Sequence, residues 1–155
     1  MEGHRVGIRL GSALAAVVFV LFAAGCGSDS DSAAGGASTS TLPAAVAGAP
    51  TMVDPQHGKA LMDQMGPALT IIDVRTPEEF AAGHIEGAVN IDLEGGGFSA
   101  GIEPLDRAAA YIVYCHSGRR SAIAAATMVT AGFTQVYDLG GIQAWQAAGL
   151  PVVTA

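Results

Sequence analysis

The chain has 155 residues, of which half are apolar and 14% are charged. This length suits one folded domain, because two domains would each have to be very small. Acidic residues outnumber basic ones by 14 to 7, which gives a formal charge of −7, and the sequence has no cluster of Lys and Arg. A nucleic-acid-binding function therefore has no electrostatic basis. The two cysteines, Cys26 and Cys115, are too few for a disulfide framework, and no Cys/His spacing resembles a zinc site.

The first 26 residues resemble a bacterial lipoprotein signal peptide. A short basic segment precedes residues 10–24, which are apolar or small. This apolar stretch is shorter than the roughly 20 residues that a membrane-spanning helix needs. It ends in Ala23-Ala24-Gly25-Cys26, which is similar to the lipobox before a lipidated cysteine, although that motif favours Leu where Ala23 stands.

The lipobox resemblance implies that residues 1–25 are removed and that Cys26 carries acyl chains such as palmitate. An ordinary secretory signal or an uncleaved anchor are the alternatives. Residues 27–50 are mainly Gly, Ser, Ala, Thr and Pro, which cannot bury enough apolar surface to fold. We therefore expect residues 26–50 to be a flexible tether and residues 51–155 to be an extracytoplasmic domain anchored to a bacterial cell membrane.

Residues 51–155 alternate the signals of helices and strands. Asp54-Pro55 is typical of a helix start, and Thr76-Pro77-Glu78-Glu79 forms a capping box. Ile123, Ala126, Thr127 and Thr130 have the spacing of one helix face. The expected elements are a helix from 55 to about 66, a strand over 69–74, a helix from 77 to about 83, a strand over 88–91, an irregular segment over 94–101, a strand over 111–114, a helix over 120–131, a strand over 135–139 and a helix over 142–148.

This alternation predicts an α/β domain with an open, mainly parallel sheet and helices on both faces. In such sheets, ligands bind beyond the carboxyl ends of the strands. Cys115 directly follows the strand over 111–114 and stands just before a helix. It therefore occupies the place where this architecture puts its chemistry.

The segment Cys115-His116-Ser117-Gly118-Arg119-Arg120 favours a thiolate. The N-terminus of the following helix directs backbone N–H groups and a positive dipole at the sulfur, and Gly118 permits the positive φ that such a loop needs. Arg119 and Arg120 add positive charge, unless both side chains point into solvent. A thiolate in an anion-binding loop suits attack on electrophilic sulfur or phosphorus. The alternative is a buried, inert cysteine.

Two sequence blocks in this region resemble single-domain rhodaneses, over residues 52–153. The first block is Ile72-Asp73-Val74-Arg75, Glu79-Phe80, Gly83-His84-Ile85, Gly87-Ala88 and Asn90-Ile91. The second is Tyr114-Cys115, Gly118, Arg120-Ser121, Gly132-Phe133, Leu139-Gly140-Gly141, Ala144-Trp145 and Gly149-Leu150-Pro151-Val152. The loop from Cys115 to Arg120 has the six-residue length of sulfurtransferases, whereas related phosphatases have a loop one residue longer.

The resemblance implies a rhodanese-like fold and a transferase, specifically a thiosulfate sulfurtransferase. A sulfane sulfur would pass from a donor such as thiosulfate to a thiophilic acceptor through a persulfide on Cys115, the catalytic residue. Backbone and side chains of the loop would bind the substrate, namely His116, Ser117, Gly118, Arg119 and Arg120. The expected partners are small sulfur-containing anions and thiol acceptors, and neither a metal nor an organic cofactor is expected.

Two other functions stay open at this point. A rhodanese-like domain can be a binding or sulfur-relay module with weak catalysis. A phosphatase or an arsenate-reductase-like enzyme is a third interpretation, against which the loop length counts. His116 has either a proton-transfer role or none.

Structural roles are expected for several other residues of the two blocks. Asp73 and Arg75 are predicted to form an ion pair at a strand end, and His84 is expected to be structural. Trp145, Phe80 and Phe133 are predicted to lie in the core.

Overall fold

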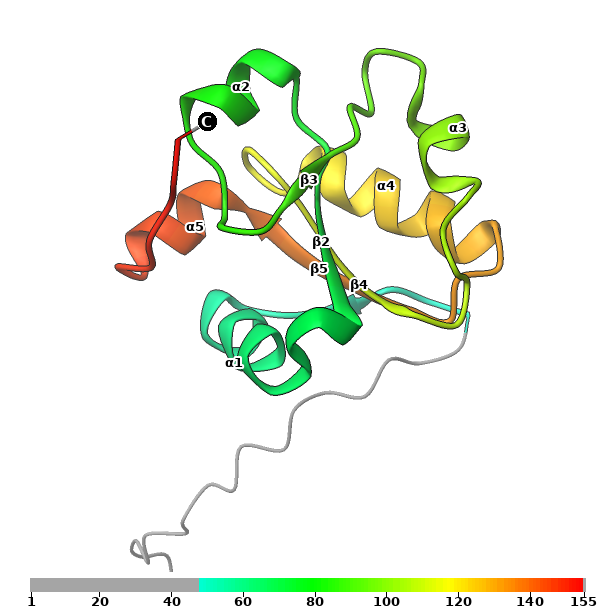
Figure 1. The fold of residues 1–155 in the computed structure, drawn as a ribbon, viewed down its shortest axis with the longest axis horizontal. Coiled ribbons are helices and arrows are strands. Elements are labelled where there is room, and N and C mark those ends of the chain that lie inside the picture. Colours follow the sequence, from blue (N-terminus) through cyan, green and yellow to red (C-terminus); the bar gives the residue numbers. More distant parts are fainter. Residues whose placement is uncertain (1–47, 155) are drawn as a thin grey trace, which may run out of the picture. The chain divides into compact units, whose positions relative to one another are not determined.

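The computed structural model describes residues 48–154, so the predicted signal peptide, Cys26 and nearly all of the predicted tether lie outside the described residues (Figure 1). The strands are β1 (Thr51–Met52), β2 (Leu69–Asp73), β3 (Val89–Asn90), β4 (Ala110–Cys115) and β5 (Gln135–Gly141). The helices are α1 (Pro55–Met65), the short 3₁₀ helix Gly66–Ala68, α2 (Pro77–Ala82), α3 (Phe98–Ile102), α4 (Arg119–Thr130) and α5 (Ile142–Ala147). Within residues 48–154, no helix has the length and apolarity needed to cross a membrane.

The five strands form one parallel sheet in the order β1-β5-β4-β2-β3. One core cluster joins the sheet to α3 and α4, and a second joins it to α1 and α5. Figure 1 shows these two helix pairs on opposite sides of the sheet. The prediction of an open parallel sheet with helices on both faces is therefore confirmed.

The central strand β4 is buried along its whole length. Its side chains alternate between the two core clusters, as the period of a strand requires. Tyr111, Val113 and Cys115 belong to the cluster with α3 and α4. Ile112 and Tyr114 belong to the cluster with α1 and α5. The strand therefore ends with two neighbouring residues, Tyr114 and Cys115, that point to opposite faces.

Local capping interactions confirm two predicted helix starts. The Asp54 carboxylate accepts a hydrogen bond from the His57 N–H at 2.9 Å, and Pro55 occupies the first turn of α1. The Thr76 hydroxyl accepts from the Glu79 N–H at 3.3 Å, while the Glu79 carboxylate accepts from the Thr76 N–H at 3.1 Å. This reciprocal pair is the predicted capping box of α2.

The structure differs from the predicted elements in the segment over 94–101 and at the start of the domain. The segment was expected to be irregular, yet α3 begins at Phe98 within it. Phe98 and Ile102 are one helical turn apart and both are buried in the core with α4, which stabilises this short helix despite its Gly content. Strand β1 was not predicted, because two residues carry no periodic pattern.

The predicted helix α4 is confirmed, but the residues whose spacing indicated it do not form its inner face. Ile123 and the residues that share its spacing lie on the outer side, where Ile123 is half exposed. The buried positions are Ser121, Ala124, Ala125 and Met128. Small side chains on this face allow α4 to pack closely on the sheet, and close packing overrides the stronger hydrophobicity of Ile.

Candidate active site

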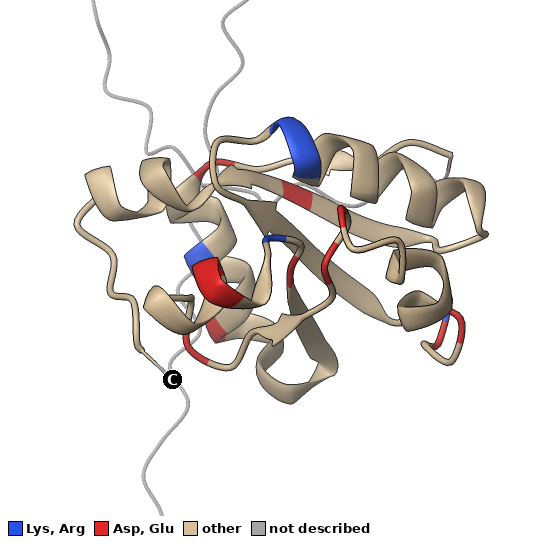
Figure 2. Cartoon of the chain, turned by 90° about the horizontal axis from the view of Figure 1, so that it is seen from above, with Lys and Arg blue, Asp and Glu red and all other residues tan. Residues whose placement is uncertain are grey.

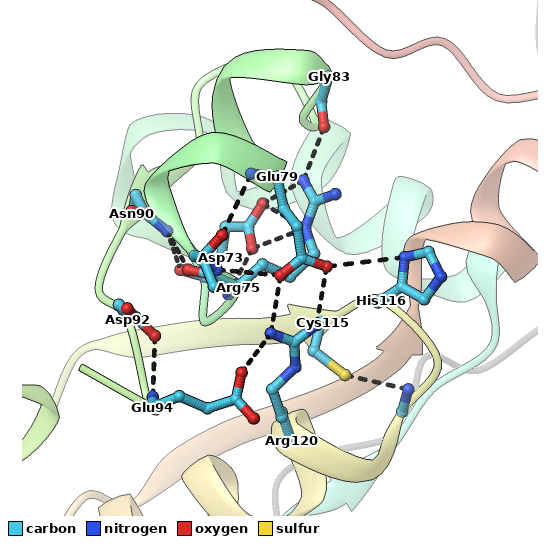
Figure 3. Close-up of polar contacts among 12 residues, drawn as sticks. Asp73, Arg75, Glu79, Gly83, Asn90, Asp92, Glu94, Cys115, His116 and Arg120 are labelled. Carbon is cyan, nitrogen blue, oxygen red and sulfur yellow. Dashed lines mark hydrogen bonds and ion pairs between the residues drawn. The ribbon is translucent and has the colours of Figure 1, made fainter. Parts of the chain in front are cut away.

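Cys115 is the last residue of β4, and its sulfur lies against the loop that leads into α4. The residue is buried, and Sγ accepts a hydrogen bond from the Gly118 N–H at 3.0 Å (Figure 3). His116 and Ser117, the residues between them, are exposed. Gly118 has φ of 104°, which confirms the predicted left-handed conformation and turns its N–H toward the sulfur. A donated N–H bond stabilises a thiolate more than a thiol.

The end of β5 packs directly under this loop. A β-bulge shifts the register between β4 and β5, so that Tyr114 pairs with Gly140 and Cys115 with Gly141. A Cβ on Gly141 would lie only 2.7 Å from the His116 carbonyl oxygen. Gly141 must therefore lack a side chain for the loop to keep this position. The Ser121 hydroxyl donates to the Gly118 carbonyl oxygen at 2.9 Å and lies 3.2 Å from that of Gly140.

Arg120 is held by two carboxylates from distant segments. Its guanidinium donates to both carboxylate oxygens of Glu79 at 2.8 Å and to Glu94 at 3.0 Å (Figure 3). The hydrogen bond to Arg120 lowers the pKa of Glu79 to about 2, and the same bond raises the pKa of Arg120. This bidentate pair joins α2 to the start of α4.

Arg119 differs from its neighbour. Its side chain is exposed and makes no hydrogen bond or ion pair with any other described residue. Of the two arginines assigned to substrate binding, Arg120 is neutralised by its partners, whereas Arg119 can offer its charge to an approaching anion.

His116 lies beside a shallow hollow between α2 and α5. Its Nδ1 is 3.9 Å from the Glu79 carboxylate, and its Nε2 is 3.1 Å from the Gln143 side-chain nitrogen. The hollow has a volume of about 150 Å³, and its walls include His116, Glu79 and Ile142. In Figure 3 the imidazole is directed toward Glu79, and the Cys115 sulfur toward the loop N–H.

A buried ion pair fixes the segment that carries Glu79. Arg75 donates to the Asp73 carboxylate at 2.6 and 3.0 Å and to the Gly83 carbonyl oxygen at 2.6 Å. The Asn90 side chain donates to the carbonyl oxygens of Asp73 and Arg75 at 3.0 and 2.8 Å. The predicted ion pair is confirmed. This network connects β2, β3 and both ends of α2, so it positions Glu79 opposite Arg120.

The remaining residues with predicted structural roles are buried or packed. Trp145 and Phe133 are in the two core clusters, as expected. The core prediction is wrong for Phe80, which is only partly buried and stacks on the His84 ring with centroids 3.8 Å apart. His84 is buried, and its backbone exchanges two hydrogen bonds with that of Val153. Among residues 48–154, no group of three His, Cys, Asp or Glu side chains could hold a metal ion.

The family model for the rhodanese-like domain matches residues 54–148, which include every element from α1 to α5. The chain belongs to the rhodanese-like family. Its domain is 37% identical over 95 residues to thiosulfate sulfurtransferase GlpE of Pseudomonas fluorescens, covering 61% of this chain and 83% of that protein. It is 41% identical over 91 residues to chloroplastic thiosulfate sulfurtransferase 16 of Arabidopsis thaliana, covering 52% of this chain and 76% of that protein.

A solved rhodanese-related protein of Thermoplasma volcanium has the same fold as this rhodanese domain. The TM-score is 0.58 at 30% identity, and the match covers 68% of this chain and 99% of that structure. These matches confirm the predicted rhodanese-like fold and the prediction of a rhodanese-type transferase.

Sequence reasoning missed Glu79 and Glu94 as parts of the site of this rhodanese domain. Glu79 was assigned to the capping box and to the first rhodanese-like block but not to the site. One of its carboxylate oxygens serves both the cap and Arg120. Glu94 lies in a Gly-rich segment without a motif. Glu94 accepts a hydrogen bond from Arg120, which lies 26 positions later, and no local sequence pattern indicates a contact over that distance.

Proposed function

We propose that this protein transfers a sulfane sulfur from a small sulfur-containing anion, such as thiosulfate, to a thiol or another thiophilic acceptor through a persulfide on Cys115. The observation that carries the proposal is the position of Sγ, 3.0 Å from the Gly118 N–H at the end of a central parallel strand. The N-terminus of the 12-residue helix α4 follows directly and adds a positive dipole. The relatives named above act on thiosulfate according to their names, which agrees with this substrate.

The first half-reaction forms the persulfide. The Cys115 thiolate attacks the outer sulfur of thiosulfate, a new S–S bond forms, and the S–S bond of the donor breaks with its electron pair leaving on sulfite. The charge of −3 is the same before and after. The loop N–H group that bonds Sγ is placed to stabilise negative charge on the sulfur that attacks.

The second half-reaction returns the enzyme to its starting form. The acceptor attacks the terminal sulfur of the persulfide, and the S–S bond breaks with its electrons returning to Cys115 Sγ. With cyanide the product is thiocyanate, and with a thiolate it is a new persulfide. Each step is a displacement at sulfur, so the cycle needs no external oxidant or reductant.

Mass measurement of the intact protein tests this function directly. Treatment with thiosulfate should add the mass of one sulfur atom, located on the peptide that contains Cys115, and later treatment with cyanide should remove it. A protein that takes up no sulfur from thiosulfate or from any other sulfane donor would instead be a rhodanese-like binding module.

We also propose that the domain is anchored outside the cytoplasm as a lipoprotein. The support is the sequence before Cys26, in which a short basic segment, an apolar stretch and small residues occur in the order of a lipoprotein signal. Metabolic labelling with a palmitate analogue tests this proposal in whole cells. The full chain should be labelled and the Cys26→Ala variant should not, whereas equal labelling of both would contradict lipidation at Cys26.

A further inference from the structure

The charges around Arg120 do not balance. One guanidinium contacts two carboxylates, those of Glu79 and Glu94, at 2.8 and 3.0 Å. Figure 3 shows this group beside Cys115. The cluster of Glu79, Glu94 and Arg120 therefore has a net charge of −1 next to the nucleophile, although its central residue is a cation.

The two carboxylates differ in their exposure and in how many contacts they make. Glu79 makes a bidentate pair with Arg120 and also caps α2, and its side chain is 30% exposed. The Glu94 side chain is 62% exposed and contacts Arg120 alone among the described side chains. Glu79 already neutralises Arg120, so Glu94 supplies the excess negative charge without holding the fold together.

Positive charge near the loop is correspondingly scarce. Of the basic residues in the described part of the chain, Lys59, Arg75 and Arg120 are paired with carboxylates. Arg107 binds carbonyl oxygens at the other end of α4. Arg119 is the remaining basic side chain beside the loop. Figure 2 shows how few basic positions this acidic domain has.

We infer that Glu94 determines which donors the site accepts, by disfavouring dianions relative to monoanions of the same shape. This inference rests on the proposed sulfur transfer. The repulsion between a fixed carboxylate and a donor grows in proportion to the charge of the donor. A donor with a single negative charge therefore loses less on approaching Cys115 than thiosulfate does, and Glu94 shifts the preference of the site toward monoanionic sulfane donors.

A pair of donors that differ in charge but hardly in shape provides the test. Thiosulfate is a dianion, and methanethiosulfonate has a methyl group in place of one charged oxygen and is a monoanion. In both, the Cys115 thiolate takes the outer sulfur while the S–S bond breaks, releasing sulfite from one and methanesulfinate from the other. The values of kcat/KM with each donor, measured with a fixed concentration of cyanide, report the effect of charge on the first half-reaction.

The variant Glu94→Gln removes the charge and keeps an oxygen that can accept from Arg120. We expect kcat/KM to increase about twofold for methanethiosulfonate and about fourfold for thiosulfate at low salt, the second factor being the square of the first, with both increases shrinking as salt is added. The matched control is Glu103→Gln, because Glu103 is an exposed acid at the end of α3 and its side chain has no contact with Arg120. The control should leave both values unchanged.

Equal changes with both donors, or none in Glu94→Gln, would overturn the inference, because a structural effect on the loop does not depend on donor charge. A second measurement does not require sulfur transfer. Iodoacetate is an anion and iodoacetamide is neutral, and each alkylates the Cys115 thiolate by displacing iodide. Glu94→Gln should accelerate iodoacetate about twofold and leave iodoacetamide unchanged. That result without turnover of any donor would reject the proposed function and keep the charge effect, whereas equal rates in both proteins would reject the charge effect.

Discussion

Tyr114 and Cys115 are consecutive residues at the end of one strand, and they meet opposite environments. The Tyr114 hydroxyl accepts from the Ile85 N–H at 3.1 Å and interacts with the Asp73 carboxylate, and burial raises its pKa. The Cys115 sulfur has the backbone N–H of Gly118 as its partner. The two loop residues between them, His116 and Ser117, are exposed. The Tyr114 side chain is held by side-chain and backbone groups of other segments, whereas the buried Cys115 sulfur is held by the N–H of its own loop.

The difference teaches how this rhodanese domain separates stability from reactivity. On the Tyr114 side, side chains bond to one another and to backbone carbonyl oxygens, and these bonds fix α2 and β3. On the Cys115 side, backbone geometry positions the loop. Gly118 has a positive φ, and the lack of a side chain at Gly141 lets β5 approach the loop closely. Substitutions on the two sides should therefore affect different measurements.

The largest effect is expected for Cys115→Ser. A serine hydroxyl cannot form the persulfide, so sulfur transfer from thiosulfate to cyanide should be abolished. The hydroxyl is small and can still accept from the Gly118 N–H, so the free energy of unfolding should change by only about 1 kcal/mol. Steady-state turnover and urea unfolding measure the two quantities. Turnover at the wild-type rate would show that another group carries the sulfur.

Gly118→Val should have the next largest effect. A β-branched residue is strained at φ of 104° and would turn the loop N–H away from Sγ. Activity should fall by roughly 100-fold or more, since an anion-stabilising donor is lost, and stability should fall by about 1–3 kcal/mol. Gly118→Ala should lie between wild type and Gly118→Val in both measurements. Full activity in Gly118→Val would show that the N–H at this position is not required.

These two predictions depend on features that the sequence displays locally. Cys115 follows an apolar run and precedes a glycine and a helix, so its place at the end of a parallel strand could be predicted. The helix α4 was also predicted, but its inner face was not, since tight packing selects Ala124 and Ala125 over Ile123. Such selection depends on the distance between a helix and a sheet, which no local pattern reports.

The contacts that complete the site are non-local, and this is why sequence reasoning missed them. Glu79 and Arg120 are 41 positions apart, and Glu94 lies between them in a Gly-rich segment. The sequence shows that these three residues are charged. Their contact arises only in the folded domain, where the sheet brings α2, the segment before α3 and the start of α4 together. The short helix α3 was missed for a related reason, because its two buried residues find their partners on α4.

Tyr114→Phe should affect stability and spare catalysis. Loss of the hydroxyl leaves the buried Ile85 N–H without its partner, which costs about 1–3 kcal/mol. The loop around Cys115 lies on the other face, so kcat/KM per folded molecule should stay close to the wild-type value. Urea unfolding and turnover at a temperature well below the unfolding midpoint separate the two effects. A large loss of kcat/KM in a fully folded sample would mean that the two faces are coupled.

The pair of Glu79 and Arg120 should make part of the stability depend on pH. The pKa of Glu79 lies at about 2 in the folded protein, below its ordinary value of 4.5, because Arg120 bonds the ionised form. Its contribution is therefore fully present above pH 4.5 and decreases as the pH falls toward 2. The difference in the free energy of unfolding between wild type and Glu79→Gln should shrink over this interval in urea titrations. A difference that stays constant from pH 6 to pH 3 would contradict the assignment.

Arg119→Ala should have the smallest effect, because this side chain is exposed and holds no partner in place. Its charge attracts an anionic donor without a fixed geometry, and ions screen exposed charges over about 10 Å at 0.1 M salt. We expect kcat/KM for thiosulfate to fall about threefold or less at low salt and to match wild type at high salt, with unfolding unchanged. Arg119→Lys keeps the charge and should show no loss. A drop as severe as that of Gly118→Val would mean that Arg119 contacts the donor in a defined position, so that the backbone would share the positioning of the substrate with a side chain.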